Sequence, residues 1–167
     1  MSIVTENGSG LATAETLISV TDCDDYHTVR GNLPWLTITT SQKEQALRRA
    51  TEFMIQAFTA RWQGERVYPL VQALDWPRQG VIVNGVSILT NIVPETVKRA
   101  CAEYALRAAA GPLLDDLTQG VTSEQVGVIQ VTYDKTSNRK TRYTAIEALL
   151  QPYLKAGGSV SVGLVRS

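Results

Sequence analysis

The chain has 167 residues, which is enough for one domain with a hydrophobic core and too few for two ordinary domains. Hydrophobic residues make up 44% and charged residues 19%, a balance that excludes wholesale disorder. The 16 Lys and Arg residues equal the 16 Asp and Glu residues, so the chain lacks the basic excess that is typical of proteins that neutralise nucleic-acid phosphates.

An N-terminal arm is the first predicted element, over residues 1–19. This stretch is polar and carries the turn dipeptides Asn7-Gly8 and Ser9-Gly10. It lacks the basic start and the apolar stretch of a signal peptide. The chain also has no run of about 18 apolar residues. We therefore expect an intracellular protein that makes no contact with a membrane.

Two helices are predicted next, over residues 21–30 and 41–62. Thr21 is a possible cap of the first helix, and Gly31 a possible end. The second helix begins with Ser41 and Glu44, which fit a capping box. Its apolar residues recur every three or four positions and predict one buried face, formed by Ala46, Leu47, Ala50, Phe53, Met54, Ala57, Phe58 and Trp62.

A long irregular loop is predicted over residues 64–93, with short β segments inside it. Loops of this length in compact domains are often functional. Trp76-Pro77-Arg78 is predicted to anchor it, with Trp76 packed and Arg78 in a polar contact, because tryptophan buries a large apolar surface and proline fixes the chain beside it. The alternative is that these three residues only form a turn.

The C-terminal half is predicted to contain two helices and a strand. A helix over 94–110 carries an opposite-charge ladder of Glu95, Arg99, Glu103 and Arg107 on its exposed side. Residues 126–133 predict a strand, and residues 143–154 a last helix. Residues 156–167 predict a C-terminal arm rich in Gly and Ser. The fold class is therefore mainly α: a small helical domain over residues 20–155, with a long loop, a short β element and an arm at each end.

Two segments are candidate contact sites. A basic stretch between Tyr133 and Tyr143 is a possible nucleic-acid or partner patch, although a solvated loop explains it as well; its residues are Lys135, Arg139, Lys140 and Arg142. The C-terminal arm is a possible contact with a partner, through Val160, Val162, Leu164, Val165 and Arg166. Apolar residues alternate from Val160 to Leu164, a pattern that suits strand addition to a neighbour, and a disordered tail end is the alternative.

No catalytic, metal or cofactor site is predicted. His27 is the only histidine and lacks a neighbouring nucleophile motif, so we expect a surface or half-buried helix residue. Three aspartates at 22, 24 and 25 do not have the spacing of a calcium loop and are explained as first-turn helix anions. Cys23 and Cys101 are expected to be buried thiols, although their separation in space, which a disulfide would require, does not follow from the sequence.

An ordered set of segments resembles a family of phage proteins encoded among the head and neck genes, which often carries the label "putative DnaT-like single-stranded DNA-binding protein". The set covers about residues 1–155. It includes Ile3-Val4, Glu6-Asn7-Gly8-Ser9-Gly10-Leu11, Leu17-Ile18-Ser19-Val20, Asp22-x-Asp24-x-Tyr26-His27, Arg30-Gly31-Asn32, Trp35, Ala46-Leu47-x-x-Ala50-Thr51, Trp62-x-Gly64, Leu74-x-Trp76-Pro77-Arg78-x-Gly80-Val81, Val93-Pro94-x-x-Val97, Gly127-x-Ile129 and Ala148-Leu149-Leu150-x-Pro152-Tyr153-Leu154.

The layout is also similar to that of the head-to-tail connector, or adaptor, proteins of tailed phages. This resemblance implies a non-enzymatic virion protein, made in the host cytoplasm, that docks under the portal protein as a ring of about twelve copies and receives the next neck or tail-completion protein. DNA would then be only passing cargo, and no cofactor is implied. The alternative function is a single-stranded DNA-binding accessory protein, as the label says.

Overall fold

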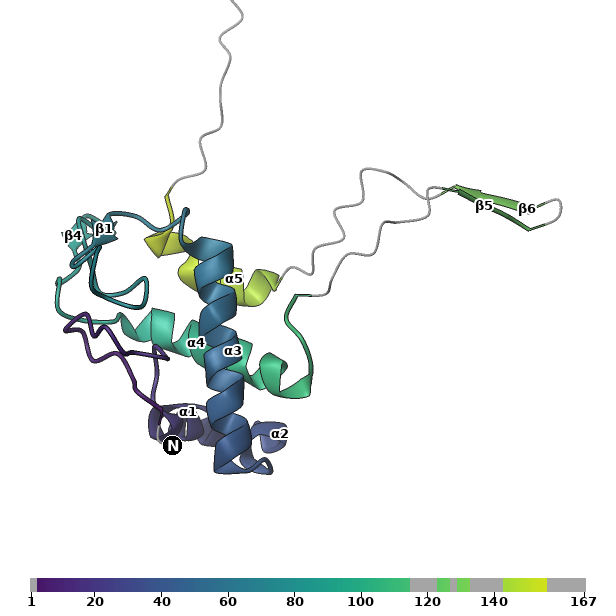
Figure 1. Ribbon diagram of the computed structural model, residues 1–167, viewed down its shortest axis with the longest axis horizontal. Helices are drawn as coiled ribbons and strands as arrows, with labels where there is room; N and C mark the ends of the chain where they lie inside the picture. The colour runs from purple at the N-terminus through teal and green to yellow at the C-terminus, as the bar shows by residue number, and fades with distance from the viewer. Residues whose placement is uncertain (1–2, 115–122, 127–128, 133–142, 156–167) are drawn as a thin grey trace, which may run out of the picture.

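The computed structural model describes residues 3–114, 123–126, 129–132 and 143–155, and the fold is mainly α-helical, as predicted (Figure 1). The described helices are α1 (Val20–Val29), α2 (Leu33–Leu36), α3 (Thr40–Phe58), α4 (Glu95–Ala110) and α5 (Thr144–Leu150), which the 3-10 turn η1 (Gln151–Tyr153) follows directly. Three antiparallel strand pairs join β1 (Glu65–Arg66) to β2 (Arg78–Gln79), β3 (Ile82–Val83) to β4 (Val86–Ser87), and β5 (Ser123–Val126) to β6 (Ile129–Thr132).

Helices α3 and α4 cross at the centre of the molecule (Figure 1). Small residues on the facing sides let the two backbones approach closely, and all of them are fully buried: Ala46, Ala50, Ala100 and Ala105. The hydroxyl of Thr51 lies 3.5 Å from the Cys101 sulfur at the crossing. Cys23 and Cys101 are both buried free thiols, and burial raises the pKa of the Cys101 thiol to about 11. The apolar stripe predicted from the sequence is therefore the interface between the two helices.

Helices α1 and α2 pack near the N-terminal end of α3 (Figure 1). Trp35 is fully buried, and its indole N–H donates to an Asp24 oxygen at 2.7 Å. Lys43 of α3 forms an ion pair with the same carboxylate at 2.9 Å. Asp24 thus connects three helices, a role that goes beyond the expected one of a first-turn helix anion.

Both predicted helix caps are displaced by two residues. Ser19, not Thr21, caps α1 by accepting from the Asp22 N–H. Thr39 and Gln42 form the capping box of α3, in place of Ser41 and Glu44. Thr39 and Ser41 can both accept a hydrogen bond from a helix N–H, so the local pattern alone does not decide between them.

Residues 3–19 do not form a free arm. Ala14, Leu17 and Ile18 belong to the same buried cluster as the helices, and Thr16 and Glu6 are buried as well. The buried polar groups of the segment are hydrogen-bonded inside the protein, since Glu6 accepts from Gly8 and the Thr16 hydroxyl donates to the Ile18 carbonyl.

Two other predicted elements differ in extent, whereas the predicted charge ladder is present. Helix α3 ends at Phe58 rather than Trp62, which instead forms an antiparallel bridge with Leu154. The strand predicted over 126–133 is the second half of a hairpin, β5–β6. The charge ladder of α4 forms as the pairs Glu95–Arg99 and Glu103–Arg107, and Glu103 also accepts from the Tyr26 hydroxyl at 3.0 Å. No described helix is long and apolar enough to cross a membrane.

Candidate interaction surface

The buried carboxylate of Asp75 organises the loop that follows α3. One of its oxygens accepts from the Thr59 hydroxyl at 2.7 Å and from the Trp62 indole N–H at 3.1 Å. The other oxygen pairs with the Arg66 guanidinium at 2.8 Å. These contacts fasten the end of α3 and strand β1 to one point inside the loop. Since a buried carboxylate is stable only when its lone pairs are used, the set acts as one unit.

Trp76 and Arg78 come directly after Asp75 in the sequence and fix the same part of the loop. Trp76 is fully buried, with its ring 5.6 Å from that of Trp62 and 5.8 Å from that of Tyr153. Arg78 donates to the carbonyl oxygens of Gln63 at 2.8 Å, Gly64 at 2.7 Å and Asp75 at 3.1 Å. Burial lowers the pKa of the Arg78 guanidinium from its usual value, and Asp75 opposes that shift. The geometry is the one that the sequence predicts for an anchor; the dependence of the loop on it stays a prediction.

The N-terminal segment supports the same loop through Glu6. This buried carboxylate accepts from the backbone N–H groups of Gly8 at 2.8 Å, Gly10 at 2.9 Å and Leu11 at 2.8 Å. Gly8 has a φ of +102°, and a Cβ there would lie 2.0 Å from the Asn91 carbonyl oxygen. Only glycine allows the segment to lie this close to the end of the loop.

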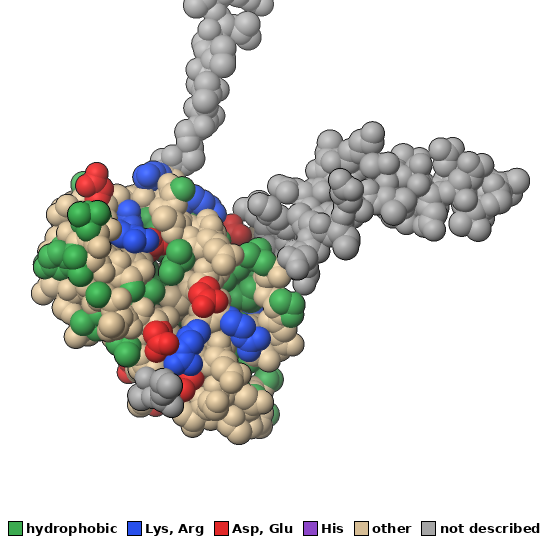
Figure 2. Space-filling view, viewed as in Figure 1, with side chains coloured by type: hydrophobic (Ala, Val, Ile, Leu, Met, Phe, Trp, Pro, Cys, Tyr) green, Lys and Arg blue, Asp and Glu red, His purple; other side chains and the backbone are tan. Residues whose placement is uncertain are grey.

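Large apolar side chains are exposed on this internally fixed loop. Leu70 is 97% exposed, Val86 67% and Leu89 65%. We call the exposed set the loop surface: Tyr68, Leu70, Val71, Ile82, Val86 and Leu89. Figure 2 shows hydrophobic side chains gathered over the β1–β4 region, at the left of the molecule. Apolar groups that gather on a well-ordered surface indicate an interaction site.

A second exposed apolar set lies near the other end of α3. Val29 of α1 is 85% exposed, and Leu33 and Leu36 of α2 are also exposed; we call these three residues the helix-end surface. Because α2 comes just before α3 and the loop just after it, the two surfaces are separated by a 19-residue helix, which is about 28 Å long.

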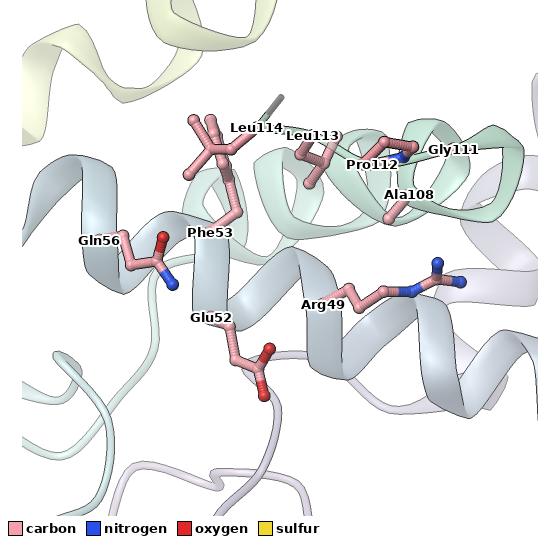
Figure 3. A pocket seen from close by; sticks show the side chains of 9 residues that line it. All are labelled: Arg49, Glu52, Phe53, Gln56, Ala108, Gly111, Pro112, Leu113 and Leu114. Carbon is pink, nitrogen blue, oxygen red and sulfur yellow. The ribbon is translucent and has the colours of Figure 1, made fainter. Parts of the chain in front are cut away.

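Two pockets in the described part of the chain are lined by a mixture of apolar, acidic and basic residues. One of about 180 Å³ lies between α3 and residues 111–114; Figure 3 shows Phe53 beside Leu114, with the Arg49 and Glu52 side chains pointing in different directions. Another, of about 440 Å³, lies between α1 and α4 and has acidic and basic residues on its walls, among them Asp22, Asp25, Arg30, Lys98 and Arg99. Among the described residues, no group of three or more His, Cys, Asp or Glu side chains could hold a metal ion.

His27 is fully buried, so the expectation of a surface or half-buried residue is wrong. Its Nε2–H donates to the Ala102 carbonyl oxygen at 3.1 Å, and its Nδ1 accepts from the Asn32 amide at 2.9 Å. This pattern fits the neutral ring. Burial lowers the pKa of His27 from its usual value, an effect that the hydrogen bond to Ala102 opposes in part.

Stability should therefore fall as the pH drops from 7 to 5. The unfolded chain takes up a proton on His27 near pH 6.5, whereas the folded chain does so only at lower pH. The contribution is full above pH 6.5 and is lost progressively below it. Urea unfolding at several pH values, with the NMR titration of this only histidine, measures both quantities. A folded-state pKa at or above 6.5 would contradict the prediction, and His27→Gln should remove the histidine part of the slope.

The structure places only some of the candidate site residues. Trp76, Pro77 and Arg78 are all buried in the loop that carries the loop surface. Two predicted contact sets lie outside the described residues: Lys135, Arg139, Lys140 and Arg142, and Val160, Val162, Leu164, Val165 and Arg166. Sequence reasoning missed Asp75, Glu6 and the loop surface. The position of Asp75 directly before Trp76-Pro77-Arg78 was the one available signal.

Comparison with known proteins assigns the chain to a family. No curated protein and no solved structure matches the chain. The model of a family described as "Putative DnaT-like ssDNA binding protein" matches residues 1–167. Two of the segments quoted for the resemblance, Trp62-x-Gly64 and Leu74-x-Trp76-Pro77-Arg78, take part in the loop described above. Because the match extends over the whole chain, this protein belongs to that DnaT-like family.

Proposed function

We propose that this protein is a structural, non-enzymatic adaptor at the head-to-tail junction of a tailed phage. It docks under the portal protein as a ring and receives the next neck or tail-completion protein. The observation that carries the proposal is the loop surface: apolar side chains are presented to water on a loop that a buried polar network holds in place. Exposed apolar side chains are unfavourable in water, and a partner that covers them removes this cost.

The two apolar surfaces suit contacts between neighbouring copies in a ring. A ring needs a heterologous contact, in which one surface of a copy meets a different surface of the next. The loop surface and the helix-end surface lie at opposite ends of α3, so one copy can use both at the same time. The C-terminal residues Val160, Val162, Leu164, Val165 and Arg166 then remain for the portal.

Assembly should depend on the portal. Alone, the protein should be a monomer or a weak oligomer; with the portal it should form a ring that copies the portal's rotational symmetry, which for this kind of junction is twelvefold. The template raises the local concentration of each copy beside the next and so strengthens weak side contacts. Light scattering and electron microscopy of the protein with and without portal measure this.

Two variants distinguish the contact between neighbouring copies from the contact with the portal. Val86→Ser with Leu89→Ser should leave portal binding intact but prevent ring closure, because the copies lose a side contact. Deletion of residues 157–167 should leave a folded protein that no longer docks to the portal. Failure of the intact protein to bind portal would overturn the adaptor proposal.

Single-stranded DNA binding is the second candidate function, and the family description favours it. Such binding combines basic residues with exposed aromatic rings. Within the described part of the chain, Tyr68 is the exposed aromatic residue, and many basic side chains already pair with acids, including Lys43, Arg48, Arg66, Arg99 and Arg107. The candidates that the sequence predicts, Lys135, Arg139, Lys140 and Arg142, lie outside the described residues.

DNA binding has a distinct signature. Affinity for an oligonucleotide should fall steeply with salt, and replacing Lys135, Arg139, Lys140 and Arg142 by serine should reduce both the affinity and that dependence. A matched control replaces four basic residues elsewhere: Arg49, Arg61, Lys98 and Lys155. Micromolar or tighter binding that only the first variant loses would establish this function; the adaptor proposal expects no such binding.

A further inference from the structure

The described chain ends beside the loop surface. The Lys155 N–H donates to the Arg61 carbonyl oxygen at 2.7 Å, and Leu154 pairs with Trp62. The Gln63 side chain connects this point to the loop, since its amide nitrogen donates to the Pro152 and Leu154 carbonyls while its oxygen accepts from the Ile82 N–H. Ile82 is a member of the loop surface and is 54% exposed. One side chain therefore separates the start of the C-terminal segment from the loop surface.

The C-terminal segment has the length and composition to reach and cover that surface. It comprises 12 residues, 156–167, and an extended chain of this length spans about 40 Å. Val160, Val162 and Leu164 alternate along it, so an extended conformation places them on one side. The segment has one charged side chain, Arg166, and nothing in its composition opposes contact with an apolar surface.

We propose that, in the free protein, residues 156–167 cover the loop surface of their own chain. Because the C-terminal segment begins close to Ile82, it can reach the loop surface of its own chain, and the contact is then intramolecular. Short flexible connections give effective concentrations of about the millimolar range, so at micromolar protein the chain's own segment outcompetes that of a second copy. Apolar contact with Val86 and Leu89 removes from water the side chains that are most exposed on the β3–β4 side of the surface.

This contact supplies a reason for portal-dependent assembly. While the segment covers the loop surface, a neighbouring copy has no free surface to bind. When the portal takes the C-terminal segment, the loop surface is released for the next copy. This consequence rests on the proposed function; the contact itself does not, and it is tested without the portal.

The test uses a fluorescent peptide of residues 156–167 and two forms of the protein. A form that ends at Lys155 should bind the peptide, because its loop surface is uncovered. The full chain should bind it at least tenfold more weakly, because its own segment competes. Val86→Ser with Leu89→Ser in the shortened form should reduce peptide affinity about tenfold, whereas Val29→Ser on the helix-end surface should leave it unchanged.

Several outcomes would overturn the proposal. Absence of peptide binding to the shortened form would show that the segment has no affinity for the loop surface, provided circular dichroism shows that this form is folded. Equal binding to both forms would show that the chain's own segment does not compete. A full chain that is dimeric, and becomes monomeric on shortening, would assign the segment to a second copy. None of these results bears on portal binding, so the adaptor proposal stands or falls separately.

Discussion

Replacement of Trp76 by alanine is expected to lower the free energy of unfolding by about 3–5 kcal/mol, the range for removal of a buried large aromatic side chain. Trp76 is fully buried and its ring lies against those of Trp62 and Tyr153. Its loss leaves a cavity between the loop, the end of α3 and the η1 turn. These elements are joined by hydrogen bonds that prevent easy collapse into the space.

Urea denaturation followed by circular dichroism measures the change. Leu70→Ala is the matched control: Leu70 belongs to the same loop but is 97% exposed, so its replacement should alter stability by no more than about 0.5 kcal/mol. If Trp76→Ala proved as mild as Leu70→Ala, Trp76 would not anchor the loop. The helices should keep most of their structure in Trp76→Ala at low denaturant, because the α3–α4 crossing does not include this side chain.

Helices α1, α3, α4 and α5 were predictable because their signals are local, whereas the four-residue helix α2 was not predicted. A stripe of apolar residues at spacings of three and four requires only the residues of one helix, and the α3 stripe corresponds to the buried face at the crossing. Capping is also local, but the hydroxyl groups of Thr39 and Ser41 can cap a helix in the same way. The choice between them depends on the path of the chain before α3, which the local sequence does not give. The error at Trp62 involves a distant partner, Leu154, whereas the strand missed in the β5–β6 pair lies directly before the predicted one.

Most of the candidate surface could not be predicted from the sequence, because the residues that hold it in place lie far apart in the chain. Glu6 satisfies neighbouring N–H groups, and Gly8 of the same segment meets Asn91, 83 positions further along the chain, only in the folded protein. His27 looks like a polar helix residue until Ala102 and Asn32 supply partners for both ring nitrogens. Exposure of Leu70, Val86 and Leu89 has no sequence signature at all, since apolar residues in a loop of this length could equally be buried.

Replacement of Asp75 by alanine should have the second large effect, a loss of about 3–5 kcal/mol in the free energy of unfolding. The substitution leaves the Trp62 indole N–H without its acceptor in a fully buried position, and removes the partner of Arg66. The Arg66 side chain is 28% exposed and can turn partly toward water, so the cost should fall in the lower part of this range.

A double-mutant cycle distinguishes the ion pair from the rest of the network. Arg66→Ala alone should cost less than Asp75→Ala, because Asp75 keeps its hydrogen bonds from Thr59 and Trp62. The double variant should be more stable than the sum of the two losses predicts, with a coupling of about 1–3 kcal/mol. Additive losses would contradict the direct pairing. Loss of Asp75 should also abolish binding of the C-terminal peptide to the form ending at Lys155, because the loop surface loses its internal support while the helical circular dichroism signal is retained.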